Sequence, residues 1–138
     1  MKTQDRPQPL AGIILTACSV LLVAGALTFA GPCAAHDGVL GPCVWAHRML
    51  VAVGVVTTVI GAVRIFELDE GERRGLSFAC GCLGVLIALT PGVVIDLCAD
   101  PAMPCQTIMR PFALAVGGAI ALVGFVDLAL RLRAVSKH

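Results

Sequence analysis

Four of the seven cysteines in this 138-residue chain lie between or beside its apolar runs, where their thiols are available for chemistry. Cys33 and Cys43 bound one short segment, and Cys98 and Cys105 bound another. Thiols placed in this way can join as disulfides, exchange electrons with other thiols, or bind a soft metal ion. The other three cysteines lie within apolar runs, where cysteine usually behaves as a small hydrophobic residue.

Disulfide formation is the chemistry expected of these four thiols if they face an oxidising compartment. Four cysteines allow three pairings, and the sequence alone leaves all three open. We favour the local pairs, Cys33 with Cys43 and Cys98 with Cys105, because each would staple one loop. A pairing between the loops would instead tie the two halves of the chain together.

Soft-metal binding is an alternative suggested by a short internal repeat, PCVWAHR at residues 42–48 and PCQTIMR at residues 104–110. Cys43 is followed four residues later by His47, and Cys105 is followed four residues later by Met109. On a helix, side chains at this spacing share a face. Thiolate, imidazole and thioether ligands together suit Cu(I). Further ligands of the same kinds in the two loops are His36 and Met103.

A third possibility is thiol–disulfide exchange, as in the four-helix membrane oxidoreductases that pass electrons from disulfides to quinone. Those enzymes use a C-x-x-C pair, whereas the spacings here are C-x9-C and C-x6-C, with a C-G-C at Cys80 to Cys82. Only Arg48 and Arg110 supply positive charge near the loops to activate a thiolate. The chain also lacks a phosphate-binding glycine loop, a paired-carboxylate site and a nucleophile triad. We therefore expect a protein that is not an enzyme.

The elements that position these cysteines are four apolar segments, at residues 10–30, 44–63, 76–97 and 112–130. Hydrophobic residues make up 58% of the chain, charged residues only 14%, and the mean hydropathy is +0.93, which is typical of a membrane protein. About 20 helical residues cross a bilayer. The sequence predicts an all-α, polytopic membrane protein: one domain, residues 1–138, with four transmembrane helices as two antiparallel hairpins.

The basic residues predict which loops face outward. Eight of the ten lysines and arginines lie at the chain ends or in the connection between the second and third segments, and only Arg48 and Arg110 fall on the other side. By the positive-inside rule, both termini are cytoplasmic and both cysteine-bearing loops are extracytoplasmic. We expect a multi-pass protein of the cytoplasmic (inner) membrane with the lipid bilayer as its partner. A net charge of +1 gives no reason to expect nucleic acid.

Charged and small residues give further expectations about how the helices pack. Arg48 and Asp96 open and close neighbouring segments at the same end, so we expect a charge pair between them. Asp127 lies one turn before Arg131 and is expected to be paired or to snorkel. Pro91 is expected to kink the third helix. Small residues recur every fourth position in three segments, which favours close helix packing: Cys80, Gly84, Ala88 and Gly92; Gly54, Thr58 and Ala62; Ala113, Gly117 and Ala121.

The segment CADPAMPCQTIMRP, with the GPC of the first loop and the histidine after it, resembles the domain of unknown function 4418 family of small four-helix bacterial and archaeal membrane proteins. The residues that carry this resemblance are Cys98, Met103, Pro104, Cys105 and Pro111. The family typically has an adjacent cysteine and histidine in the first loop, whereas here VWA separates Cys43 from His47.

Genes of this family look to be found near ABC-type permeases. The resemblance therefore implies an accessory or assembly subunit of a larger membrane complex, with other membrane-protein subunits as partners. We expect no cofactor. It establishes no activity. Copper binding and quinone-linked thiol oxidation remain the alternatives.

Overall fold

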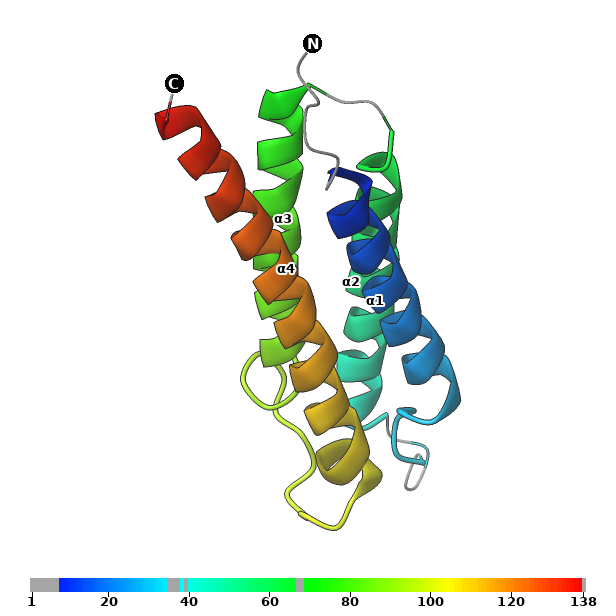
Figure 1. The fold of residues 1–138 in the computed structure, drawn as a ribbon. Helices are drawn as coiled ribbons and strands as arrows, with labels where there is room; N and C mark the ends of the chain where they lie inside the picture. The colour runs from blue at the N-terminus through cyan, green and yellow to red at the C-terminus, as the bar shows by residue number, and fades with distance from the viewer. Residues whose placement is uncertain (1–7, 35–37, 39, 67–68, 138) are drawn as a thin grey trace.

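The computed structural model describes residues 8–34, 38, 40–66 and 69–137. Within these residues the chain is all-α and contains no strand beyond an isolated bridge between Pro91 and Ile95. A π-helical turn, η1 (Cys105–Met109), leads directly into the last helix. The four helices are α1 (Gln8–Thr28), α2 (Pro42–Val63), α3 (Glu70–Leu89) and α4 (Arg110–Ser136) (Figure 1).

Local sequence explains where the helices begin. Gly41 is extended and precedes Pro42, which occupies the first turn of α2. Proline is favoured at this position because its missing N–H would have no helical partner there and its fixed φ already suits a helix. Pro111 lies in the first turn of α4 in the same way. Glu70 and Glu72 lie in the first turn of α3, where their negative charges interact favourably with the helix dipole.

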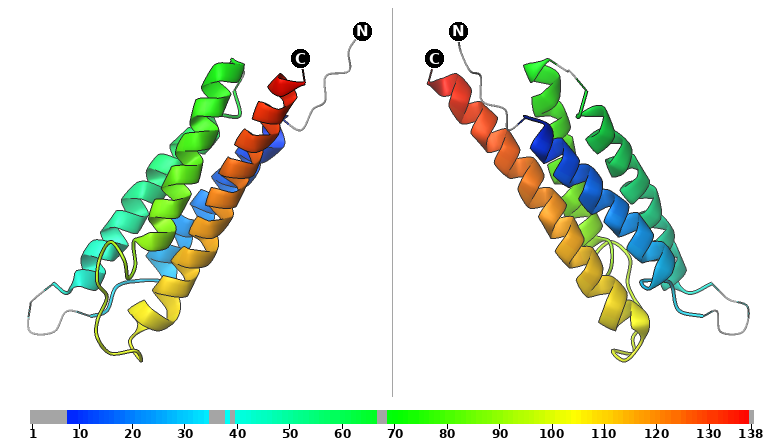
Figure 2. Two further views of the ribbon diagram at one scale, coloured as in Figure 1. Left: turned by 90° about the vertical axis from the view of Figure 1, so that its left-hand side faces the viewer. Right: turned by 45° about the vertical axis from the view of Figure 1, so that its right-hand side comes forward.

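The helices run lengthwise beside one another, with α1 packed on α2 and α3 packed on α4 (Figures 1 and 2). The connection from α1 to α2 and the connection from α3 to η1 lie at the same end of the bundle, which we call the loop end. The start of α1 and the end of α4 lie at the opposite end. The two segments that carry the four loop cysteines are therefore brought together.

The closest helix contact is between α3 and α4, and glycine makes it possible. A Cβ atom added to Gly84 would lie 2.4 Å from the backbone nitrogen of Ala121, and one added to Gly117 would lie 2.6 Å from the backbone nitrogen of Ala88. Such close backbone contact is how helices gain packing energy where the hydrophobic effect is weak. The small-residue packing expected at these four positions is confirmed.

Three segments are long and apolar enough to cross a membrane: Leu10–Thr28, Pro42–Val63 and Cys105–Ser136. Among the described residues, α3 does not meet this description. Its first turns carry Glu70, Glu72, Arg73 and Arg74. The described part of the chain therefore forms four α-helices, and three of its helical segments have the length and composition of membrane spans.

The third helix differs from the one expected at residues 76–97, because it begins at Glu70 and ends at Leu89. Pro91 explains the end, since it lacks an N–H and disfavours helical backbone at the preceding residue. Gly92 then adopts a φ of 97°, which favours glycine, and its N–H donates to the carbonyl of Ile95. The expected kink at Pro91 is thus wrong, and the chain leaves the helix there.

Candidate metal centre

The four loop cysteines come from four different segments at the loop end. Cys33 lies in the connection after α1, and Cys98 lies in the connection after α3. Cys43 lies in the first turn of α2, directly after Pro42, and Cys105 opens η1 directly after Pro104. The repeated Pro-Cys pair therefore has the same role twice, because in each case proline starts a helical segment and cysteine occupies its first turn.

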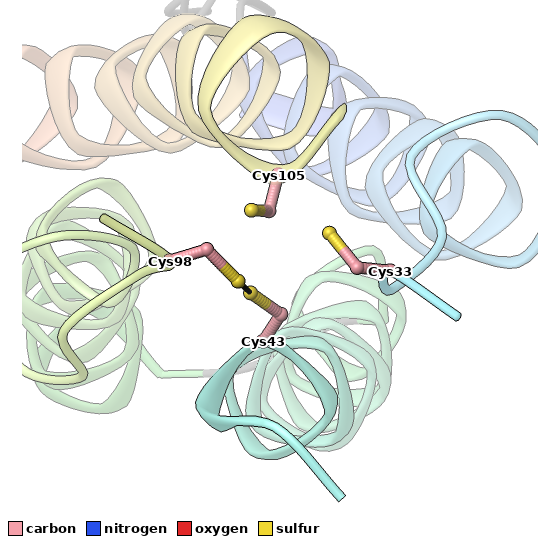
Figure 3. Close-up of side chains that lie close together, drawn as sticks. All are labelled: Cys33, Cys43, Cys98 and Cys105. Carbon is pink, nitrogen blue, oxygen red and sulfur yellow. Dashed lines mark hydrogen bonds between the residues drawn. The ribbon is translucent and has the colours of Figure 1, made fainter. Parts of the chain in front are cut away.

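All four sulfur atoms lie within 4.8 Å of one another, and their side chains point towards a common centre (Figure 3). Cys43 Sγ and Cys98 Sγ are hydrogen-bonded at a distance of 2.8 Å. We call Cys33, Cys43, Cys98 and Cys105 the sulfur cluster. Among the cysteine, histidine, aspartate and glutamate side chains of the described residues, these four cysteines have the spacing of a metal site.

The size of the sulfur cluster suits a single metal ion. A tetrahedral ion with metal–sulfur distances of about 2.3 Å holds its sulfur atoms roughly 3.8 Å apart. The sulfur separations here reach at most 4.8 Å, and the shortest, at 2.8 Å, must widen by about 1 Å to admit an ion. A shift of about 1 Å in a sulfur position corresponds to a rotation of roughly 30° about the cysteine Cα–Cβ bond.

The environment of the sulfur cluster is apolar on one side and open on the other. Cys43 and Cys105 are buried in the hydrophobic core, whereas Cys33 and Cys98 are half-buried. A cavity of about 140 Å³ adjoins the cluster. It is lined by Cys33, Ala34, Gly41, Cys43, Val44, Cys98 and Met103, none of which is charged. An ion can therefore reach the thiols without crossing the core.

The two half-buried thiols differ in acidity. Burial alone would raise the pKa of Cys33, but hydrogen bonds with Cys105, Cys43 and Cys98 outweigh it and lower this pKa below that of an ordinary thiol. At Cys98 the hydrogen bond with Cys43 lowers the pKa, but burial together with interactions with Cys105 and Cys33 outweighs that bond, and the pKa is raised. Cys33 is therefore the more readily ionised of the two.

The structure brings together only part of the ligand set that the repeat suggested. Cys43 and Cys105 are in the sulfur cluster, but the imidazole Nε2 of His47 lies 2.9 Å from the carbonyl oxygen of Ala26, and His47 is not in the cluster. Met109 is fully buried in the core, one helical turn beyond Cys105. The helical spacing that singled out His47 and Met109 places them one turn further into the bundle.

Two residues from the loops complete the set instead. Cys33 and Cys98 were expected to form disulfides, yet all seven cysteines are free thiols in this structure. Neither expected disulfide staple is formed, and the hydrogen-bonded thiols Cys43 and Cys98 belong to different loops rather than to one. Met103 lines the adjoining cavity, and His36 lies outside the described residues. The equal number of cysteines in the two loops is the signal that could have pointed to this cluster.

The charge pair expected between Arg48 and Asp96 is not formed among the described residues. Both side chains are exposed, and the Arg48 guanidinium instead lies over the ring of Trp45, 5.3 Å from its centre. Asp96 lies in the irregular connection after Pro91 rather than at the end of a helix. Because α3 ends early, Asp96 is not held at a helix end facing Arg48.

A second polar cluster lies at the opposite end of the bundle, and only part of it was expected. Asp127 of α4 accepts hydrogen bonds from Arg64 at 2.5 Å, from Arg131 at 2.8 Å and from Ser77 at 2.8 Å. Arg131 also pairs with Glu70. Arg64 follows α2 and is only 2% exposed, so this charge is buried. The pairing expected of Asp127 is confirmed, and its buried partner Arg64 was missed.

The fold and the sulfur cluster together define an all-α protein with membrane-span-length helices and a four-thiol site at one end. Residues 13–130 match the family model described as "Domain of unknown function (DUF4418)". The chain belongs to this family, as the resemblance of its second loop indicated. No curated protein and no solved structure matches the chain.

Proposed function

We propose that this protein is a membrane protein that binds a soft metal ion, with Cu(I) as the favoured ion, through Cys33, Cys43, Cys98 and Cys105. The observation that carries the proposal is the convergence of the four sulfur atoms within 4.8 Å of one another. Residues that are far apart in the chain supply them, so local sequence does not explain the convergence. Thiolate ligands select soft ions and disfavour Mg²⁺ and Ca²⁺, which prefer oxygen.

Ligand softness, rather than charge, favours Cu(I) over Zn²⁺. With the same number of thiolates, Cu(I) leaves one negative charge more than Zn²⁺, and none of the described residues that line the cavity is cationic. Two thiolates keep the net charge of a Cu(I) site to −1. Met103 beside the cavity offers a thioether, which is a soft and uncharged ligand.

The proposal includes a membrane topology in which all four helices cross, both termini are cytoplasmic and the sulfur cluster is extracytoplasmic. The distribution of lysine and arginine supports this orientation. The apolar exposed face of α3, which includes Phe78, Val85 and Leu89, supports contact between this helix and lipid. The charged first turns of α3 would then lie in the cytoplasmic interface, where they can be hydrated.

Metal titration of the purified, reduced chain tests the binding proposal. Cu(I), supplied anaerobically in competition with a coloured chelator, should bind with a stoichiometry of one ion per chain. Cys43→Ser should weaken binding at least about tenfold, because even outer-shell substitutions commonly cost 10–100-fold in metal affinity. Cys82→Ser is the matched control, since Cys82 is exposed and outside the sulfur cluster. Equal affinities for the two variants would overturn the proposal.

The accessory-subunit role implied by the family resemblance stays a prediction. Other membrane-protein subunits would be its partners, and purification in a mild detergent would show whether they co-purify with the chain. The second candidate function, quinone-linked thiol oxidation, is favoured by one observation, the 2.8 Å contact between Cys43 and Cys98. Reoxidation of the reduced chain that depends on added quinone would support it, and reoxidation at the same rate without quinone would count against it.

A further inference from the structure

Cys43 and Cys98 of the sulfur cluster lie close enough to form a disulfide, and a disulfide between them is incompatible with metal binding by both thiols. Cys43 Sγ and Cys98 Sγ are 2.8 Å apart, so they need to approach by less than 1 Å to reach the S–S bond length of about 2.05 Å. They need to separate by about 1 Å to share a tetrahedral ion. The same pair therefore lies between two incompatible arrangements, one bonded to sulfur and the other bonded to metal.

We infer that Cys43 and Cys98 form a redox pair whose oxidation to a disulfide dismantles the sulfur cluster and releases its metal ion. This inference rests on the proposed metal-binding function. Oxidation converts two of the four ligands into a disulfide, which is a poor ligand, because only thiolates bind these metals well. Cys33 and Cys105 then remain as an isolated pair, with half of the original ligand set.

The reaction balances with a peroxide or a disulfide as the oxidant. In the metal-bound cluster the two sulfur atoms are thiolates, which lose two electrons as one S–S bond forms and the ion leaves. With hydrogen peroxide the O–O bond breaks, two protons are taken up from water, and two molecules of water are produced. With an external disulfide, thiolate attack gives a mixed disulfide, and the second thiol then displaces the leaving thiolate. The half-buried Cys98 and the adjoining cavity give such a reagent access to this pair.

The location of the pair gives oxidation a structural effect as well. Cys43 lies in the first turn of α2, whereas Cys98 belongs to the connection that follows α3. A bond between them joins the first half of the chain to the second half at the loop end. Described contacts between α2 and α3 are fewer than those within α1–α2 or α3–α4. The disulfide therefore links the two helix pairs where they otherwise contact each other less.

Disulfide mapping in a cleavable chain tests which pair oxidises first. A protease site introduced between α2 and α3 separates residues 33 and 43 from residues 98 and 105 after cleavage. Under limiting hydrogen peroxide, a Cys43–Cys98 disulfide should hold the two fragments together on a non-reducing denaturing gel, and mass spectrometry should identify the linked peptides. Local bonds, Cys33–Cys43 or Cys98–Cys105, would let the fragments separate and would overturn the inference.

Paired variants compare two of the possible links between the fragments, Cys43–Cys98 and Cys33–Cys105. Of the sulfur cluster, the double variant C33S/C105S keeps Cys43 and Cys98, and it should cross-link at least about tenfold faster than C43S/C98S, which keeps Cys33 and Cys105. Equal rates would overturn the assignment of the redox pair. Mapping of the unsubstituted chain gives an independent answer if a double variant does not fold.

Metal release is measured on the same protein loaded with Cd²⁺, a soft ion that is not itself oxidised. Loss of the thiolate–cadmium absorption should follow disulfide formation in parallel, with one ion released for each disulfide formed. Retention of Cd²⁺ by the oxidised chain would overturn the inference and leave the metal-binding proposal standing. Failure of the reduced chain to bind either Cd²⁺ or Cu(I) would overturn the proposed function and the release step together, while the cross-linking result would stand.

Discussion

At the scale of single residues, the four thiols of the sulfur cluster are chemically unequal although they lie so close together. Cys33 and Cys98 are both half-buried, so differences in their reactivity reflect acidity more than access. The pKa of Cys33 is lowered by hydrogen bonds from its three neighbours, which outweigh its burial, whereas the pKa of Cys98 is raised. Because the thiolate is the nucleophile, acidity controls which cysteine reacts first.

We predict that a neutral alkylating reagent labels Cys33 faster than Cys98 in the reduced, metal-free chain near pH 7. A lowered pKa means that Cys33 holds thiolate at a pH where Cys98 is still protonated, and raising the pH should narrow the difference as Cys98 ionises. Mass spectrometry of peptides after brief labelling measures both rates. The denatured chain is the control, because both thiols should react alike there. Preferential labelling of Cys98 would contradict the prediction.

At the scale of helices, α3 and α4 depend on the absence of side chains where they touch. The neighbours Gly117 and Gly118 of α4 provide a matched comparison. A Cβ on Gly117 would lie 2.6 Å from the Ala88 backbone nitrogen, whereas a Cβ on Gly118 would meet no atom within 4 Å. A contact with backbone cannot be relieved by rotating a side chain, so the helices must move apart.

We predict that Gly117→Ala lowers the free energy of unfolding by about 1–3 kcal/mol, the usual cost of overpacking. Gly118→Ala adds the same methyl group in open space, and it should be neutral or stabilise by up to about 1 kcal/mol through helix propensity. Reversible unfolding of the two variants in detergent micelles measures both changes. If both variants have the same free energy of unfolding as the unsubstituted protein, close backbone contact between α3 and α4 does not stabilise the bundle.

The sequence predicted the helices better than it predicted the site. Apolar runs of about 20 residues indicate helices directly, and the stripe containing Gly84 and Ala88 indicated the α3–α4 contact. The early end of α3 was missed because hydropathy continues through Pro91 to Leu97, although proline prevents the helix from continuing. The sulfur cluster was missed as a unit because its members come from two distant loops. Helical spacing, which pointed to His47 and Met109, describes neighbours on one helix only.

At the scale of the whole molecule, a buried ion pair fixes the end of the bundle opposite the sulfur cluster. The Arg64 side chain, at the end of α2, is 1% exposed, and Asp127 of α4 is 14% exposed. Ser77 of α3 also donates to Asp127, so three helical segments meet at one carboxylate. Nη2 of Arg64 donates to Asp127, whereas Nε and Nη1 have no hydrogen-bond partner among the described residues, which makes Asp127 the main compensation for this charge.

We predict that Asp127→Asn destabilises the protein by about 3–5 kcal/mol, because removal of one partner leaves a buried, uncompensated charge. The double variant R64M/D127L removes both charges and should recover most of the loss. Glu70→Gln is the control: the Glu70 side chain is 58% exposed, and its pair with Arg131 should contribute no more than about 1 kcal/mol. Unfolding midpoints in micelles measure the stability of the variants. An unchanged midpoint for Asp127→Asn would show that the Arg64–Asp127 pair does not stabilise the protein.

Orientation in the membrane is the second prediction at this scale. A reporter fused to the carboxyl terminus should be active only in the cytoplasm, because five of the ten basic residues lie in the last turns of α4, in the connection between α2 and α3 or in the first turns of α3, including Arg64 and Arg133. A membrane-impermeant thiol reagent should then reach Cys33 from the outside of intact cells. A reporter active on the outer side would reverse the proposed topology.

Unequal helix lengths also bear on the lipid around the protein. At about 1.5 Å per residue, the 20 residues of α3 span roughly 30 Å, whereas the 27 residues of α4 span roughly 40 Å. In the proposed topology, in which α3 also crosses the membrane, the two helices differ in length, and accommodating a mismatch between helix and lipid costs fractions of a kcal/mol per Å. Acyl chains next to α3 would be compressed relative to those next to α4.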